Sequence, residues 1–219
     1  MERLRSKYSD PRLVARYDLR YADFAGRRSN ARVLRAVRRA LEPLPSGARV
    51  LDLPCGTGRL FELLATAGWR PCGVDRSVDM LRAIPATARR ARDRAIPLAA
   101  ADVLALPFRG KCFDAAVCLR FLQLLEPAER VEVLRALARV TRGPLVAVYS
   151  PHHTWKDVTR ALRRWLGVRK KKKEREAWIP WREIEAEIAA AGLVCTRRIH
   201  ACRGLVDAVA LRLEAPPAR

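Results

Sequence analysis

The chain has 219 residues, half of them hydrophobic, with six cysteines and a formal net charge of +21. This length suits one domain with a sizeable core, and the hydrophobic content excludes a disordered polypeptide. The sequence shows no apolar run as long as a membrane span, no apolar signal-peptide stretch behind its charged start MERLRSKYSD, and no cysteine spacing typical of zinc sites.

Residues 1–45 are predicted to form a helical cap that precedes the main sheet. Asp10 followed by Pro11 is a helix start signal. Asn30 is predicted to cap a second helix that runs to about Leu41, where the prolines at 43 and 45 end it. Basic residues are concentrated in this region, so it contributes much of the positive charge.

Residues 49–60, RVLDLPCGTGRL, predict a buried strand that runs into a glycine turn and then a helix. Asp52 lies at the carboxyl end of the strand. Gly56 and Gly58 allow positive φ angles and a close approach of a ligand to the backbone. The third glycine of a dinucleotide fingerprint is replaced by Phe61, and no Lys-Ser/Thr pair follows, so neither a dinucleotide site nor a P-loop is expected.

Two further acidic residues follow the glycine turn at informative spacings. After a helix predicted over 59–67, the run 71–74 is a second strand that ends in Asp75. A carboxylate about 20 residues beyond such a turn is placed to accept both hydroxyls of a ribose. Asp102 follows a third strand in AADVLALPF, where it is either a ligand contact or a loop cap.

The segments D-x-P-C-G-T-G, GVDRSVDML and AADVLALPF, in this order, resemble the motifs of the class I S-adenosylmethionine (SAM)-dependent methyltransferases, in particular the branch acting on quinones and other small molecules. The resemblance covers about residues 49–213. It implies an α/β fold, a Rossmann-like, doubly wound, mostly parallel sheet of seven strands with a C-terminal antiparallel strand pair. It also implies that SAM is the cofactor, contacted by Tyr17, Asp52, Pro54, Cys55, Gly56, Thr57, Gly58, Asp75, Arg76, Met80, Asp102, Val103 and Arg120.

The remaining pattern completes this single domain, with a core over 46–150 and a C-terminal part over 181–219. Strands are expected at 113–119 and 144–150, with an amphipathic helix between them. Residues 151–180 are expected to be a basic lid insertion. A helix over 181–191, stopped by Gly192, precedes strands at 193–201 and 205–213.

Candidate catalytic residues follow the strands that end near the methyl donor. His152 and His153 follow the strand ending at 150, and a histidine titrates near neutral pH; a surface loop is their alternative setting. Arg120 could hold a carboxylate or phosphate of the acceptor, or pair with Glu126. Gln123 could orient an acceptor but is a poor base.

The expected acceptor is a small or lipid-like molecule with some anionic character. The CLRF segment after the fourth strand lacks the D/N-P-P-Y/F/W motif of enzymes that methylate exocyclic base amines. The net charge of +21 reflects either GC-rich codons or attraction to an anionic partner. An RNA methyltransferase using the basic segments and a non-catalytic SAM-binding or membrane-associated module remain alternatives. We expect a cytoplasmic protein, with peripheral contact to an anionic membrane or RNA.

Overall fold

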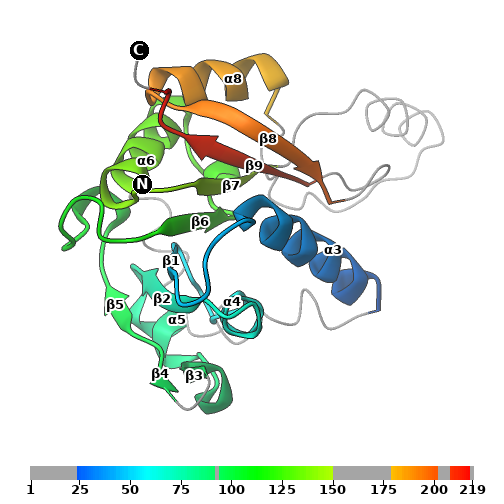
Figure 1. The fold of residues 1–219 in the computed structure, drawn as a ribbon, viewed down its shortest axis with the longest axis vertical. Helices are drawn as coiled ribbons and strands as arrows, with labels where there is room; N and C mark the ends of the chain where they lie inside the picture. The colour runs from blue at the N-terminus through cyan, green and yellow to red at the C-terminus, as the bar shows by residue number, and fades with distance from the viewer. Residues whose placement is uncertain (1–23, 92–93, 150–178, 202–207, 218–219) are drawn as a thin grey trace, which may run out of the picture.

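The computed structural model describes residues 24–91, 94–149, 179–201 and 208–217, and they are built around one seven-stranded sheet of order β5-β2-β1-β6-β7-β9-β8 (Figure 1). The strands are parallel except for β9, which is antiparallel to both of its neighbours. The strands comprise β1 Arg49–Asp52, β2 Arg70–Asp75, β5 Leu98–Ala100, β6 Ala115–Leu119, β7 Leu145–Tyr149, β8 Val194–His200 and β9 Val209–Glu214. This arrangement confirms the predicted sheet.

Helices cover both faces of the sheet (Figure 1). The α-helices are α3 Phe24–Leu41, α4 Phe61–Thr66, α5 Val78–Arg82, α6 Pro127–Val140 and α8 Trp181–Ala190; η2 Ala86–Arg89, η3 Val103–Ala105 and η4 Leu122–Leu124 are 3-10 turns. One core cluster joins α3 and α4 to one face, and another joins α6 and α8 to the opposite face. In the described ranges, no helix combines the length and the apolar character needed to cross a bilayer.

Two local predictions differ from the structure. Helix α3 is already helical at Phe24, so Asn30 lies within it and the predicted cap at Asn30 is wrong. The buried Asn30 Oδ1 has no hydrogen-bond partner. Helix α4 begins at Phe61, two residues later than predicted, because residues 59 and 60 still belong to the turn. A short hairpin, β3 Arg90–Ala91 with β4 Arg94–Ala95, was not predicted.

Phe61 explains why this glycine turn differs from a dinucleotide fingerprint. The buried ring lies beneath the turn, and a Cβ on Gly58 would lie 2.8 Å from Phe61 Cδ2. A Cβ on Gly73 of β2 would lie 2.5 Å from Phe61 Cζ. The ring therefore fills the space between turn and sheet, and the glycine on the neighbouring strand makes room for it.

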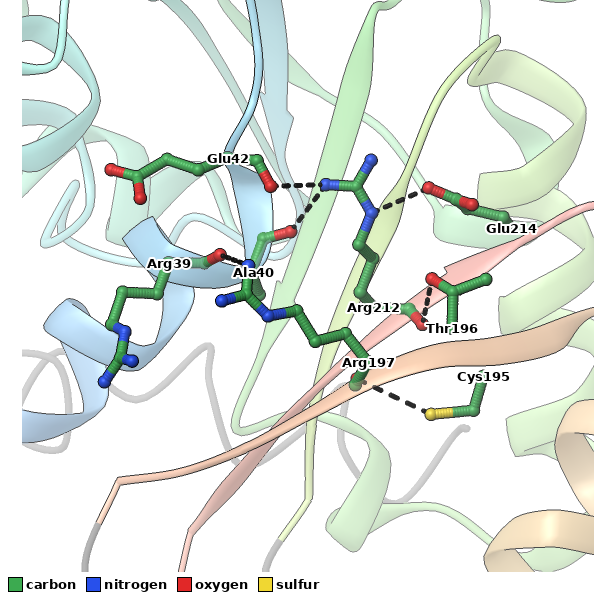
Figure 2. A network of polar contacts seen from close by, with 8 residues as sticks. All are labelled: Arg39, Ala40, Glu42, Cys195, Thr196, Arg197, Arg212 and Glu214. Carbon is green, nitrogen blue, oxygen red and sulfur yellow. Dashed lines mark hydrogen bonds and ion pairs between the residues drawn. The ribbon is translucent and has the colours of Figure 1, made fainter.

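Two arginines from the C-terminal strand pair hold the end of helix α3. Figure 2 shows Arg212 of β9 beside this helix end: its Nη1 donates to the carbonyl oxygens of Ala40 and Glu42, at 3.0 and 2.9 Å. Arg197 of β8 donates to the carbonyl of Arg39 at 2.9 Å. The last carbonyls of a helix lack partners within the helix and carry partial negative charge. The two guanidinium groups therefore cap α3 from strands more than 150 residues away.

Replacing Arg212 with glutamine is expected to lower the free energy of unfolding by about 1.5–3 kcal/mol, because hydrogen bonds to a charged group are lost from a half-buried site. Chemical denaturation measures this change. Arg135→Gln is a matched control, since Arg135 also donates to a carbonyl, that of Ala190, but from an exposed position. Equal losses in the two variants would contradict the capping role of Arg212.

Candidate active site

Three carboxylates gather where the parallel strands end. Asp52 is the last residue of β1, Asp75 is the last residue of β2, and Asp102 follows β5. The chain leaves β1 toward β2 on one side, while β6 lies on its other side, so the order of the sheet reverses beside β1. Ligands of open α/β sheets bind at the carboxyl edge next to such a reversal. The structure thus brings these three predicted acids to one edge.

The carboxylate of Asp75 links the glycine turn to the end of β2 by hydrogen bonds. Its Oδ2 accepts a hydrogen bond from the backbone N–H of Gly56 at 2.9 Å, and its Oδ1 accepts one from the N–H of Ser77 at 2.9 Å. Burial raises the pKa of this carboxyl, while the two N–H groups act in the opposite direction. Each oxygen keeps a second lone pair. The carboxylate is fixed in place and can still accept two hydroxyl groups.

Asp52 is buried and lacks a hydrogen-bond partner for one carboxylate oxygen, Oδ1. Burial raises its pKa well above the ordinary value; the positive charge of Arg59 opposes this shift and the negative charge of Asp75 adds to it. Arg59 was missed in the sequence as a contributor to the site, because it stood in the pattern as the first residue of a helix. The two acids and one arginine leave a partly uncompensated negative charge.

Asp102 acts as the loop cap that was one of its two predicted settings. Its Oδ1 accepts the N–H of Leu104 at 3.0 Å at the start of η3. Its Oδ2 forms an ion pair with Nη1 of Arg76 at 3.3 Å. Arg76 follows Asp75 directly, so the ion pair links the segments after β2 and β5. The contact of Asp102 with the cofactor stays a prediction.

The glycine turn has the backbone conformation that was predicted from its sequence. Gly56 and Gly58 have φ angles of +53° and +78°. The side chains of Cys55 and Thr57 are buried. Burial raises the pKa of the Cys55 thiol, so this cysteine is a packed, protonated group rather than a nucleophile.

The other predicted cofactor contacts in this region surround the turn. Pro54 is partly exposed beside it. Met80 lies in α5 with its side chain buried, and its N–H donates to Ser77 Oγ. The side chain of Val103 is also buried, within the core beside α6. The predicted contacts of Met80 and Val103 with the cofactor stay predictions.

The segment after β6 carries two polar residues near the same edge. Arg120 has a φ angle of +57°, a conformation uncommon outside glycine, which reverses the chain directly after the strand. Gln123 is buried in η4, with its Oε1 lacking a partner. Glu126, the alternative partner considered for Arg120, takes part in the capping box of α6 together with Glu129.

Several predicted residues lie outside the described residues. They are Tyr17, His152 and His153, together with most of the basic segment 151–180. Their contribution stays a prediction.

The described residues fit SAM in charge and in shape. SAM combines a sulfonium, an ammonium and a carboxylate, so it carries a net positive charge. The acids Asp52 and Asp75 provide a complementary negative environment, which the positive charge of Arg59 opposes at Asp52. Asp52 Oδ1 has no hydrogen-bond partner, so it can accept a hydrogen bond from a ligand. The glycines of the turn have no side chains, so a ligand can approach their backbone.

Replacing Asp52 with asparagine is expected to stabilise the protein without cofactor and to weaken SAM binding at least tenfold. Burial raises the pKa of Asp52 in the folded protein, so keeping this carboxyl ionised lowers the free energy of unfolding. This lost stability returns as the pH falls through the raised pKa and the carboxyl takes up a proton. Removal of the charge should raise the melting temperature by about 2–4 °C per kcal/mol recovered. Thermal denaturation and calorimetric titration with SAM measure the two effects.

The wild-type protein provides the pH control for this prediction. Its SAM affinity should fall as the pH is lowered, and the fall should begin above the range in which an ordinary aspartate is protonated, because burial raises the pKa of Asp52. The Asp52→Asn variant should show a flatter pH dependence. A variant that is less stable and binds SAM as tightly as the wild type would contradict this account of Asp52.

Comparison with known proteins identifies similar chains. Residues 50–143 match a family described as "Methyltransferase domain". The demethylmenaquinone methyltransferase of Corynebacterium kroppenstedtii is 37% identical over 131 residues, which are 55% of this chain and 53% of that protein. A mouse tRNA (carboxymethyluridine(34)-5-O)-methyltransferase is 32% identical over 121 residues, 53% of this chain and 17% of that protein. The chain thus spans about half the length of the bacterial relative.

Among solved structures, the magnesium protoporphyrin IX methyltransferase of Synechocystis with bound S-adenosylhomocysteine (SAH) superimposes with a TM-score of 0.77. The alignment covers 99% of this chain and all of that chain, at 18% sequence identity. At this identity, the likeness shows that the two chains share a fold.

Proposed function

The chain belongs to the class I SAM-dependent methyltransferases, and we propose on this premise that it transfers the methyl group of SAM to a small-molecule acceptor. The observation that carries the proposal is the Asp75 carboxylate, which is fixed by the N–H groups of Gly56 and Ser77 at the carboxyl edge of the sheet. The match of residues 50–143 to a methyltransferase domain supports it.

Each of the three acids of the site would bind a different part of SAM. Asp75 would accept the two ribose hydroxyls, Asp102 the exocyclic amine of adenine, and Asp52 would face the positively charged methionine end. SAM itself supplies the activated methyl group, which an acceptor displaces in line with the sulfur. The protein would then contribute mainly by holding the acceptor atom aligned with the methyl carbon.

The acceptor side would be formed by the segments after β6 and β7. Arg120, held at its turn directly after β6, would orient an anionic group of the acceptor. The buried amide of Gln123 would add a polar contact nearby. His152 or His153 would act as the base if the acceptor needs to lose a proton.

We infer further that the acceptor is lipid-like and is reached at an anionic membrane surface. The relative from C. kroppenstedtii is named for a quinone acceptor. Helix α3 has no acidic residue, and Phe24 at its start is 66% exposed. Its exposed arginines are Arg27, Arg28, Arg32, Arg35, Arg38 and Arg39. An amphipathic helix with such a basic face favours contact with anionic lipid.

The test incubates the protein with radiolabelled SAM and cell-extract fractions. Label in the lipid or metabolite fraction, lost in Asp75→Ala, would support the proposal. SAM binding without transfer to any fraction would favour a non-catalytic module. Sedimentation with vesicles tests the membrane inference. We expect the protein to bind only vesicles that contain anionic lipid. The triple substitution R28Q/R32Q/R35Q should weaken this binding, and Arg135→Gln on α6 should not.

RNA is the second candidate acceptor, and one comparison favours it. The mouse relative is named as a tRNA methyltransferase, although this chain covers only 17% of that protein. The basic face of α3 would then contact phosphates. Transfer of label into the RNA fraction, with affinity that falls steeply as salt is added, would decide for this candidate.

A further inference from the structure

A second pocket lies at the opposite end of the sheet from the three carboxylates. It is lined by the first residues of β1 and β2, by the strand β4 and by the loop before β6, and its volume is about 850 Å³. This volume falls within the range of small-ligand sites. The methyl-donor residues lie at the other ends of the same strands, so the pocket is separate from the candidate active site.

Four arginines line this pocket: Arg49, Arg70, Arg94 and Arg109. None of the lining residues is acidic. Within the part of the chain that the structure describes, none of the four guanidinium groups makes a hydrogen bond or an ion pair. The nearby Asp114 is already engaged by the N–H of Arg49 and by Arg142.

Arg49 and Arg70 are placed side by side by the strand register itself. Each is the first residue of its strand, and the two are register partners in the parallel pair β1–β2. Adjacent strands lie about 4.8 Å apart, and like charges at paired positions destabilise a sheet. A bound anion would offset these two positive charges, and within the described residues neither guanidinium group has an acidic partner.

The rest of the pocket is apolar and firmly built. Cys72, Ile96 and Phe113 form buried or half-buried parts of its wall, and Phe108 packs edge-on against Phe113 with ring centroids 5.1 Å apart. The loop that carries Arg109 is anchored by Arg139 of α6, which donates to the carbonyls of Leu106 and Phe108. The pocket therefore exists before any ligand arrives.

We propose that this amino-edge pocket binds a small organic phosphate, with its negative charge between the four arginines and its apolar body against the Ile96 and Phe108 side. Arginine forks bind phosphate oxygens in pairs, which suits a pocket lined by four arginines. The concave shape and the apolar wall favour a compact molecule over an extended polymer. The site is distinct from the methyl-donor site and does not depend on the proposed function.

The test titrates 2-naphthyl phosphate into the protein saturated with SAH, so that the donor site is filled. Saturable binding is expected, with R70Q/R109Q weakening it at least tenfold and Arg82→Gln, at an exposed position on α5, changing it less than twofold. Retained SAH binding shows that the variants are folded. Arg94→Gln, in the short hairpin, provides a second variant and should weaken binding at least threefold.

Three outcomes would overturn the proposal. The first is no saturable binding of 2-naphthyl phosphate, and the second is equal affinity in all the variants. The third is equal affinity for uncharged 2-naphthol, which would mean that the arginines do not select a phosphate.

Discussion

Replacing Asp75 with alanine is expected to reduce SAM affinity at least a hundredfold. The carboxylate would accept two ribose hydroxyls, and each hydrogen bond to a charged group contributes about 1.5–3 kcal/mol. The substitution also frees the N–H groups of Gly56 and Ser77, which this carboxylate now holds at 2.9 Å each. The turn that faces the cofactor would then lose its attachment to β2. Calorimetric titration with SAM and with SAH measures the loss.

Two variants separate this effect from general damage to the fold. Asp79→Ala removes a carboxylate of α5 that forms an exposed ion pair with Arg82, and it should bind SAM as the wild type does. Asp75→Asn keeps the shape but has a single acceptor oxygen, so an intermediate affinity is expected. If Asp75→Ala bound SAM within threefold of the wild type, the assigned donor site would be wrong.

Replacing Arg130 with methionine is expected to lower the free energy of unfolding by about 3–5 kcal/mol, as for removal of one partner from a buried ion pair. Arg130 of α6 is 2% exposed and donates to Glu187 Oε1 at 2.8 Å and to the carbonyl of Leu125 at 2.7 Å. It also pairs with Glu183, so it joins α6 to α8. Urea denaturation measures the change.

In the Arg130→Met variant, the Glu187 carboxylate stays buried without its partner, so the loss of stability should be large and should depend on pH. Burial raises the pKa of Glu187, and Arg130 now opposes that shift. Without the arginine, the folded pKa rises further, so the protein binds a proton more readily when folded and regains stability as the pH falls through that pKa. The wild type should show less of this recovery.

A double variant provides the control. R130M/E187L replaces both charges with apolar side chains and should recover at least half of the lost stability, because a buried apolar pair is tolerated where a single buried charge is not. A loss of less than about 1 kcal/mol in Arg130→Met would show that the ion pair contributes little to stability.

The fold and the placement of the candidate site residues at one sheet edge were predictable because their signals are local. The turn of residues 54–58 requires glycine where φ is positive, and +53° and +78° are found at the two predicted positions. Asp52 and Asp75 end strands, and parallel strands end at the same edge of a sheet, so their proximity followed from the pattern. Helix α8 and its stop at Gly192, which has a φ of +73°, followed in the same way.

The errors and omissions concern residues whose role depends on distant partners. Asn30 is a common capping residue type, but α3 is already helical from Phe24, so Asn30 lies inside the helix. Arg59 was assigned to a helix start, whereas its guanidinium influences Asp52. Neither outcome could be obtained from neighbours in the chain.

By itself, the sequence determined the order of strands and helices, the glycine turn and the edge where the acids meet. These features depend on hydrophobic periodicity and on backbone conformation, which are set by a few neighbouring residues. The tertiary structure decided which distant groups meet. A register shift between Cys195 and Arg197 turns Arg197 toward α3, where it caps the helix with Arg212. The alignment of β1 with β2 pairs Arg49 with Arg70. Such contacts depend on strand register, which packing across the whole sheet fixes.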